Sequence, residues 1–181
     1  MLPQQGHVVL PDGTVVRGRG RRDAPADPPP EFGLYLHRRR GGWEPGWPAQ
    51  WLDWPDFRTP RDRDAAAAAI EHAHRLARDG SRVEIACDGG TGRTGTVIAC
   101  MAVLAGHPAE DAVAWTRAHY RPRAVETPWQ RRWVLWFAAR RPDDDGAGRV
   151  SRPAPSSDGP TGTGRCSTPC RWPGCWPRSC R

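Results

Sequence analysis

The chain has 181 residues, of which 38% are hydrophobic and ten are tryptophan, which is enough apolar material for one folded domain. Its net charge is +7, all 27 basic residues are arginine, and residues 151–181 carry five arginines against one acidic residue, so much of the surplus lies there. No apolar run is long enough to span a bilayer, and residues 1–7 lack a secretory signal pattern. We therefore expect a cytoplasmic protein that binds neither membranes nor nucleic acid.

The first part of the chain predicts short strands. Residues 7–10 and 14–16 flank a Pro-Asp-Gly turn, which is typical of a β-hairpin. Residues 17–30 are polar and rich in glycine and proline, so they predict a surface loop. Residues 32–36 predict another strand, and residues 51–54 an extended segment.

Helices are expected over the alanine-rich and apolar segments that follow. Residues 60–79 predict a helix with Thr59 as its N-cap and Pro60 at its first position. Two further helices are expected at residues 92–105 and 108–119.

A glycine-rich turn joins the apolar strand at residues 83–87 to the helix at residue 92. It begins at Cys87 and ends at Arg93 and Thr94, and its residues in order are Asp88, Gly89, Gly90, Thr91 and Gly92. The N–H groups of such a turn and the positive end of a following helix suit a tetrahedral oxyanion, to which Arg93 adds two parallel donors. A helix N-terminus and a nearby cation also favour a thiolate at Cys87, which is a nucleophile. The turn predicts a phosphate-binding loop formed by residues 88–93 around a reactive sulfur.

Two motifs together resemble the cysteine-dependent protein tyrosine phosphatase superfamily, in its small bacterial-type or dual-specificity-like members. Cys87 to Thr94 matches C-x5-R-[ST], and Trp54-Pro55-Asp56 resembles the mobile WPD loop. The resemblance implies an α/β fold with a central four- to five-stranded mixed sheet flanked by helices. It implies hydrolysis of phosphate monoesters through a phosphocysteine intermediate, without metal or cofactor. Cys87 would attack, Arg93 bind the phosphoryl oxygens, Asp56 serve as acid and then base, and Thr94 stabilise the departing thiolate.

A third segment, residues 124–130, resembles the family's Q-T-x-x-Q element at the start of the last helix. Thr127 is expected to cap that helix, and Gln130 to orient the attacking water. Two positions differ from the family, because Ala86 replaces a histidine and Glu126 replaces the first glutamine. A phosphate-binding pseudophosphatase is therefore an alternative, as is a phosphoinositide or small-molecule phosphatase. The expected substrates are phosphotyrosine or, more broadly, phosphoproteins.

We expect residues 1–141 to form the phosphatase domain of a monomer and residues 142–181 to be a disordered tail. The tail is poor in aliphatic residues, and its cysteines at 166, 170, 175 and 180 lack paired C-x-x-C spacing. His72 and His74 are two residues apart and point in different directions on a helix, so no metal site is predicted. The second acid near the WPD motif, Asp53, is expected to bond locally rather than to act in catalysis.

Overall fold

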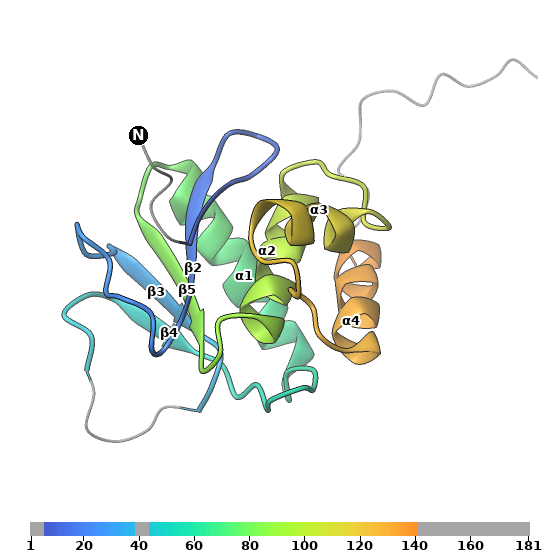
Figure 1. Ribbon diagram of the computed structural model, residues 1–181, viewed down its shortest axis with the longest axis horizontal. Coiled ribbons are helices and arrows are strands. Elements are labelled where there is room, and N and C mark those ends of the chain that lie inside the picture. The colour runs from blue at the N-terminus through green and yellow to red at the C-terminus, as the bar shows by residue number, and fades with distance from the viewer. Residues whose placement is uncertain (1–5, 39–43, 141–181) are drawn as a thin grey trace, which may run out of the picture. The chain divides into compact units, whose positions relative to one another are not determined.

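The computed structural model describes residues 6–38 and 44–140, which form a mixed sheet covered by helices (Figure 1). In chain order the elements are β1 (His7–Val9), β2 (Val15–Gly20), β3 (Phe32–Tyr35), β4 (Ala49–Trp51), α1 (Arg63–Arg78), β5 (Val83–Cys87), α2 (Gly92–Leu104), α3 (Ala112–His119) and α4 (Pro128–Ala139). The strand order is β1-β2-β5-β3-β4, with β1 antiparallel to β2 and the other pairs parallel. The expected fold class is confirmed.

Strand β5 lies between β2 and β3, which places its end in the middle of the sheet. Cys87, its last residue, pairs with Gly20, the last residue of β2. In open α/β sheets, the carboxyl ends of neighbouring parallel strands form the usual ligand-binding edge. The loop predicted to bind phosphate therefore begins at this edge.

The N-terminal hairpin is confirmed, but the prediction of a loop from residue 17 is wrong. Val8 pairs with Val16 in the hairpin, and β2 then continues to Gly20 beside β5. A Cβ at Gly18 would lie 2.7 Å from the ring of Tyr120. Gly18 and Gly20 are therefore explained by groups that approach the strand closely, and not by a turn of the chain.

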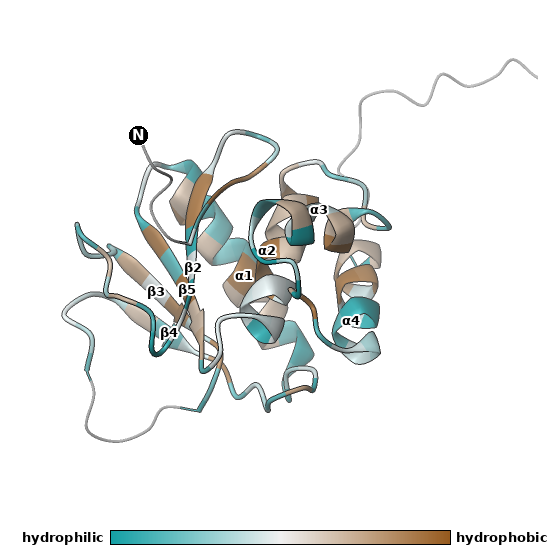
Figure 2. Cartoon of the chain, viewed as in Figure 1, coloured by the Kyte–Doolittle hydropathy of each residue, from teal (hydrophilic) through white to brown (hydrophobic). Residues whose placement is uncertain are grey.

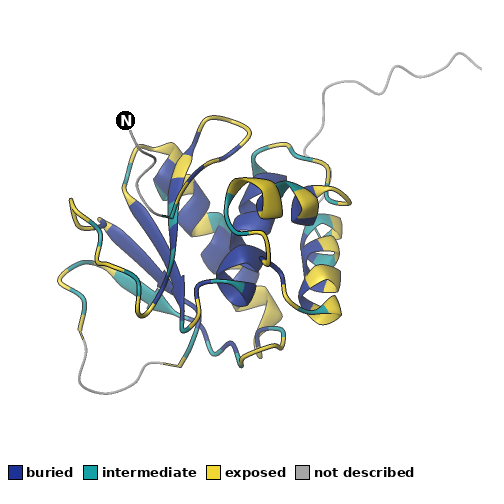
Figure 3. Cartoon of the chain, viewed as in Figure 1, coloured by how far each residue is buried: buried dark blue, intermediate teal, exposed yellow. Residues whose placement is uncertain are grey.

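Helices α1 and α2 contact the sheet, and their apolar residues join those of the strands in one core. Figure 2 shows hydrophobic residues along β3, β5 and α2. Helix α2 contacts the sheet, α1, α3 and α4, so it is buried along nearly its whole length (Figure 3). Its burial fixes the loop that precedes it, since the helix cannot shift without disturbing the core.

Three elements begin two or more residues away from their predicted starts. Helix α1 begins at Arg63, because Asp62 and not Thr59 accepts the hydrogen bond from the N–H of Ala65. Helix α3 begins at Ala112, and β4 lies at Ala49–Trp51, just before the WPD motif. The Thr127 cap of α4 is confirmed.

No helix in residues 6–38 and 44–140 is long and apolar enough to cross a membrane. The expected domain end at residue 141 and the tail 142–181, with its four cysteines, lie outside the described residues.

Candidate active site

The loop from Cys87 to Arg93 makes a tight turn between β5 and α2. Gly90 has a φ of +65°, a conformation that side chains other than glycine adopt at a cost. A Cβ at Gly90 would also collide with the backbone nitrogen of Gly20. The turn therefore requires glycine at this position both for its conformation and for its contact with β2.

The sulfur of Cys87 accepts two hydrogen bonds inside the loop. The N–H of Gly90 and the hydroxyl of Thr94 each donate to it over 3.1 Å. Cys87 is buried, and Thr94 lies in the first turn of α2. Thr91, the N-cap residue of that helix, accepts no hydrogen bond from the helix through its side chain, whereas the Thr127 hydroxyl at the start of α4 accepts one from the N–H of Gln130. The first N–H groups of α2 are thus left without a side-chain cap beside the sulfur.

The side chain of Arg93 is only 3% exposed. Its Nη1 donates to the carbonyls of Leu36 (2.9 Å) and Trp54 (3.0 Å), which fix the guanidinium to the end of β3 and to the WPD segment. Its Nη2 lies 3.1 Å from a carboxylate oxygen of Asp88 and 3.2 Å from one of Asp56. Two acidic side chains therefore meet at the nitrogen that faces the loop.

The WPD turn brings Asp56 to Arg93 because Trp54 anchors it. The Trp54 indole is buried, donates to the carbonyl of Arg58 (2.8 Å) and packs against Trp133, with ring centroids 5.1 Å apart. Asp56 itself is 57% exposed, so it can be reached from solvent.

Asp53 makes the local contacts expected of it. Its carboxylate lies 3.3 Å from Arg61 and 3.7 Å from Arg38, all on the surface. It is therefore held by surface arginines while Asp56 contacts the buried one.

Gln130 is fully buried, and the structure uses its side-chain oxygen as part of a capping box. This oxygen accepts from the backbone N–H groups of Glu126 (2.8 Å) and Thr127 (3.2 Å). Its amide nitrogen has no hydrogen-bond partner within the described part of the chain and would lie 3.1 Å from a Cβ at Gly92. A Cβ at Gly92 would also collide with the carboxylate of Glu126. Both side chains thus reach the start of α2 beside the loop.

Sequence reasoning missed two side chains that donate to carbonyls of the loop, and the acidic side chain that pairs with one of them. Tyr120 donates to the carbonyl of Gly90 (2.5 Å), and Arg121 donates to that of Gly89 (3.1 Å). Asp23, between β2 and β3, pairs with Arg121 at 2.5 Å. The only signal was an aromatic and a basic residue just before the segment that resembles Q-T-x-x-Q, where the sequence indicated merely the end of a helix.

Two of these groups have shifted pKa values. Burial raises the pKa of the Tyr120 hydroxyl, the charge of Arg121 opposes this, and the nearby Cys87 and Asp23 raise it further. Burial alone would raise the pKa of Asp23, but the hydrogen bond from the Gly20 N–H and the guanidinium of Arg121 bring it below its ordinary value. The Tyr120 hydroxyl therefore stays protonated and acts as a hydrogen-bond donor at neutral pH, and Asp23 is an anion.

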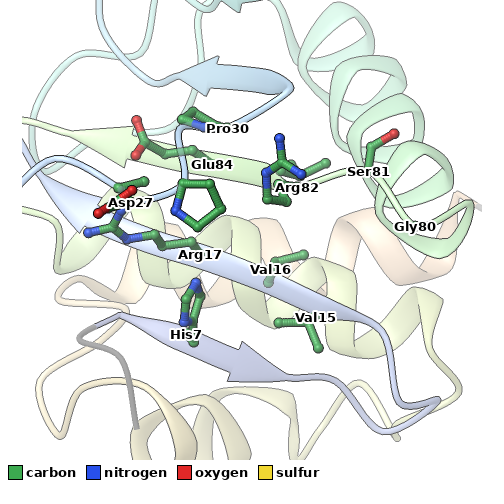
Figure 4. Close-up of a pocket in the computed structure, with 13 residues that line it drawn as sticks. His7, Val15, Val16, Arg17, Asp27, Pro30, Gly80, Ser81, Arg82 and Glu84 are labelled. Carbon is green, nitrogen blue, oxygen red and sulfur yellow. The ribbon is translucent and has the colours of Figure 1, made fainter.

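A cavity of about 200 Å³ lies at the other end of β5 and includes none of these residues (Figure 4). It is lined by His7, Arg17, Arg82 and Glu84, among others. Burial and the charge of Arg17 lower the pKa of His7 there. The cavity is thus distinct from the candidate site at Cys87.

Comparisons with known proteins agree with this geometry. Residues 51–133 match the family described as "PTP-SAK: Swiss Army Knife protein, DSP-PTPase phosphatase domain". The matched segment is less than half of the chain, and together with the fold it supports the resemblance to the cysteine-dependent protein tyrosine phosphatase superfamily that the sequence motifs predict. Within that superfamily, the matched segment is similar to the dual-specificity-like phosphatase domains. A comparison with curated proteins gives no match.

Solved structures with the same fold include three phosphatases. The structure titled "Tk-PTP in the active form" is 22% identical, with a TM-score of 0.60, and the match covers 77% of this chain and 99% of that one. Human DUSP28 is 15% identical, with a TM-score of 0.59 and coverage of 74% and 95%. A mouse putative dual specificity phosphatase complexed with zinc tungstate is 16% identical, with a TM-score of 0.58 and coverage of 77% and 90%. These likenesses establish the fold.

Proposed function

We propose that this protein hydrolyses phosphate monoesters through a phosphocysteine intermediate, without a metal ion. One observation carries the proposal: Arg93 lies at the end of the Cys87 loop and contacts Asp56, so a nucleophile, an oxyanion-binding group and an acid converge. Burial of the guanidinium strengthens its interaction with phosphoryl oxygens, because the local dielectric is low.

In the first step the Cys87 thiolate attacks phosphorus. The S–P bond forms as the bond from phosphorus to the leaving oxygen breaks, and Asp56 supplies that oxygen with a proton. Arg93 and the loop N–H groups hold the other three phosphoryl oxygens. The Nε of Arg93 is buried without a hydrogen-bond partner among residues 6–38 and 44–140, and a bidentate oxyanion spanning Nε and Nη2 would satisfy it.

In the second step water attacks phosphorus and the S–P bond breaks. The Asp56 carboxylate takes the proton of the water, and the Thr94 hydroxyl, 3.1 Å from the sulfur, stabilises the thiolate as it leaves. Gln130 is proposed to orient this water. Its oxygen already accepts two backbone hydrogen bonds, so its amide nitrogen is the group that would do so.

The proposed substrates are phosphotyrosine or other phosphorylated proteins, in keeping with the dual-specificity-like family. Phosphoinositide and small-molecule phosphates remain alternatives that a substrate panel would separate. The cytoplasmic location and the monomeric state stay predictions, as does the absence of nucleic-acid and membrane partners.

A binding-only pseudophosphatase is the second candidate, and the contact between Asp88 and Arg93 favours it. The Asp88 carboxylate lies 3.1 Å from the nitrogen that would hold phosphate, and so competes with it. Such a protein would bind an oxyanion but release no phosphate from any monoester.

Asp56→Asn tests the proposed mechanism. We expect kcat for an alkyl phosphate to fall ~10²–10⁴-fold, the usual contribution of a positioned general acid. The loss should be smaller for an aryl phosphate whose leaving group needs little protonation. Steady-state kinetics with the two substrates would measure the difference.

The matched control is Asp53→Asn, which changes an acid three residues away whose carboxylate, within the described part of the chain, pairs with the surface arginines Arg38 and Arg61. Its kcat should stay close to that of the wild type for both substrates. Equal rates for Asp56→Asn and wild type would contradict the role given to Asp56.

Asp88→Asn should strengthen oxyanion binding. The substitution removes the charge that competes for Arg93, so the inhibition constant of inorganic phosphate should fall about 2- to 5-fold, as expected for a partly exposed ion pair. Competitive inhibition of aryl phosphate hydrolysis would measure it. Weaker inhibition by phosphate would mean that Asp88 supports the loop more than it blocks it.

A further inference from the structure

The outer side of the Cys87 loop is held by a set of contacts that the proposed chemistry does not use. The Tyr120 hydroxyl donates to the carbonyl of Gly90 (2.5 Å), and Nη1 of Arg121 donates to that of Gly89 (3.1 Å). Nη2 of Arg121 pairs with Asp23 at 2.5 Å. Two successive loop carbonyls are therefore held by side chains that lie about thirty residues further along the chain.

The direction of these carbonyls decides the direction of the loop N–H groups. In a planar trans peptide the C=O and the following N–H point in opposite directions. The Gly89 carbonyl shares its peptide plane with the N–H of Gly90, which donates to the Cys87 sulfur over 3.1 Å. The Gly90 carbonyl shares its plane with the N–H of Thr91. Holding both carbonyls outward therefore turns both N–H groups toward the inside of the loop.

Strand β2 leaves the space that this arrangement needs. A Cβ at Gly18 would lie 2.7 Å from the Tyr120 ring, and one at Gly20 would lie 3.0 Å from the carbonyl of Gly89. The Asp23 carboxylate accepts from the N–H of Gly20 (2.7 Å), so the residue that anchors Arg121 is itself fixed to the end of β2. The contacts thus join the loop, β2 and the end of α3 into one rigid unit.

The protonation states suit the roles of these groups. Burial raises the pKa of Tyr120, so its hydroxyl keeps the proton that it donates at neutral pH. The charge of Arg121 is matched by Asp23, whose pKa lies below its ordinary value.

We propose that Tyr120 and Arg121 are positioning residues for oxyanion binding: they hold the Gly89 and Gly90 carbonyls outward, so that the N–H groups of Gly90 and Thr91 face the sulfur and a bound phosphoryl group. The inference rests on the proposed function for its consequence in catalysis. Its consequence for oxyanion binding does not require turnover.

The test measures binding of inorganic tungstate, a tetrahedral dianion, by calorimetry on the full chain. Tyr120→Phe removes one hydrogen bond and should weaken tungstate binding about 2- to 10-fold, the usual range for a single net hydrogen bond. Arg121→Met should weaken it at least as much, and Arg121→Lys should restore part of the loss because it keeps a donor. In ¹H–¹⁵N spectra, the Gly90 and Thr91 amide signals should shift in each weakened variant.

Two further variants keep the test decisive. Arg82→Met removes an arginine that pairs with Glu31 away from the loop, and it should bind tungstate like the wild type. Gly18→Ala displaces the Tyr120 ring without removing a polar group, and it should weaken binding even if Tyr120→Phe does not fold. Thermal unfolding of each variant shows whether the protein is folded at the temperature of the binding measurement.

Unchanged tungstate affinity and unchanged Gly90 and Thr91 signals in Tyr120→Phe and Arg121→Met would overturn the inference. Failure of the wild type to hydrolyse any phosphate monoester would instead contradict the proposed function alone, because tungstate binding is measured without turnover.

Discussion

Cys87→Ser should remove measurable hydrolysis while leaving the site able to bind an oxyanion. A serine hydroxyl stays protonated at neutral pH and no group in the proposed mechanism serves to deprotonate it, so the nucleophile is lost. We expect kcat to fall by at least ~10⁴-fold, since removal of a nucleophile costs up to about 10⁶ in the enzymes where it has been dissected. Serine is close in size to cysteine, and its oxygen can still accept from Gly90 and Thr94. Tungstate binding should therefore persist.

Aryl phosphate hydrolysis and tungstate calorimetry on the same preparation would check both halves of this result. Cys100→Ala is the matched control, because Cys100 is the other cysteine among the described residues and is fully buried within α2. Burial raises the pKa of the Cys100 thiol, so it is a poor nucleophile, and its removal should leave kcat close to the wild-type value. Substantial hydrolysis by Cys87→Ser would exclude the phosphocysteine route.

Local sequence patterns were enough to predict the parts of the site that depend on neighbouring residues. The spacing from Cys87 to Arg93, bounded by an apolar strand and an apolar helix, predicted a short turn at the start of a helix, and the structure has one. The Thr127 cap could also be predicted from neighbouring residues, because its hydroxyl accepts from the N–H of Gln130, three residues later. The fold class also followed, because the resemblance rests on motifs that occur in this fold.

The features that were missed depend on residues far apart in the chain. Gly18 and Gly20 suggested a loop, and the packing of Tyr120 and Gly89 against them explains why an interior strand carries glycine there. The same holds for Asp23 and Arg121, an ion pair between residues separated by most of the domain. No periodicity or local spacing in the sequence connects such pairs.

Gln130 illustrates a different limit. The motif that it resembles predicts contact with water, but the same side chain also occupies the N3 position of a helix, where its oxygen completes a capping box. The two roles compete for one oxygen, and sequence alone cannot weigh them. In the structure the oxygen accepts from the backbone N–H groups of the cap, so the amide nitrogen is the group that would contact the water.

Arg93→Lys should be almost as damaging as loss of the nucleophile, although it keeps the positive charge. We expect kcat to fall ~10³–10⁵-fold, the range found when an arginine that stabilises a phosphoryl transition state is lost. The two terminal nitrogens of the guanidinium have different partners. Nη1 donates to the carbonyls of Leu36 and Trp54, while Nη2 contacts the carboxylates of Asp88 and Asp56. A single ammonium cannot do both, because lysine presents a point charge without a planar fork.

The loss should also alter the position of the general acid. Nη2 contacts Asp56, and Nη1 holds the carbonyl of Trp54 two residues earlier, so Arg93 fixes the WPD turn at two points. Without them the acid is less well placed, and the further effect of Asp56→Asn should be smaller in an Arg93→Lys background than in the wild type. Kinetics of the two single variants and the double variant would measure this coupling.

The control is Arg61→Lys, the same substitution at an exposed arginine that pairs with Asp53 on the surface. It should keep kcat within about twofold of wild type, since exposed ion pairs contribute little. Thermal unfolding must accompany the kinetics, because the substitution at Arg93 also leaves buried carbonyls with fewer donors. If folded Arg93→Lys kept more than about a tenth of wild-type kcat, planar bidentate recognition of the phosphoryl group would not be the basis of the chemistry, and charge alone would account for the role of this residue.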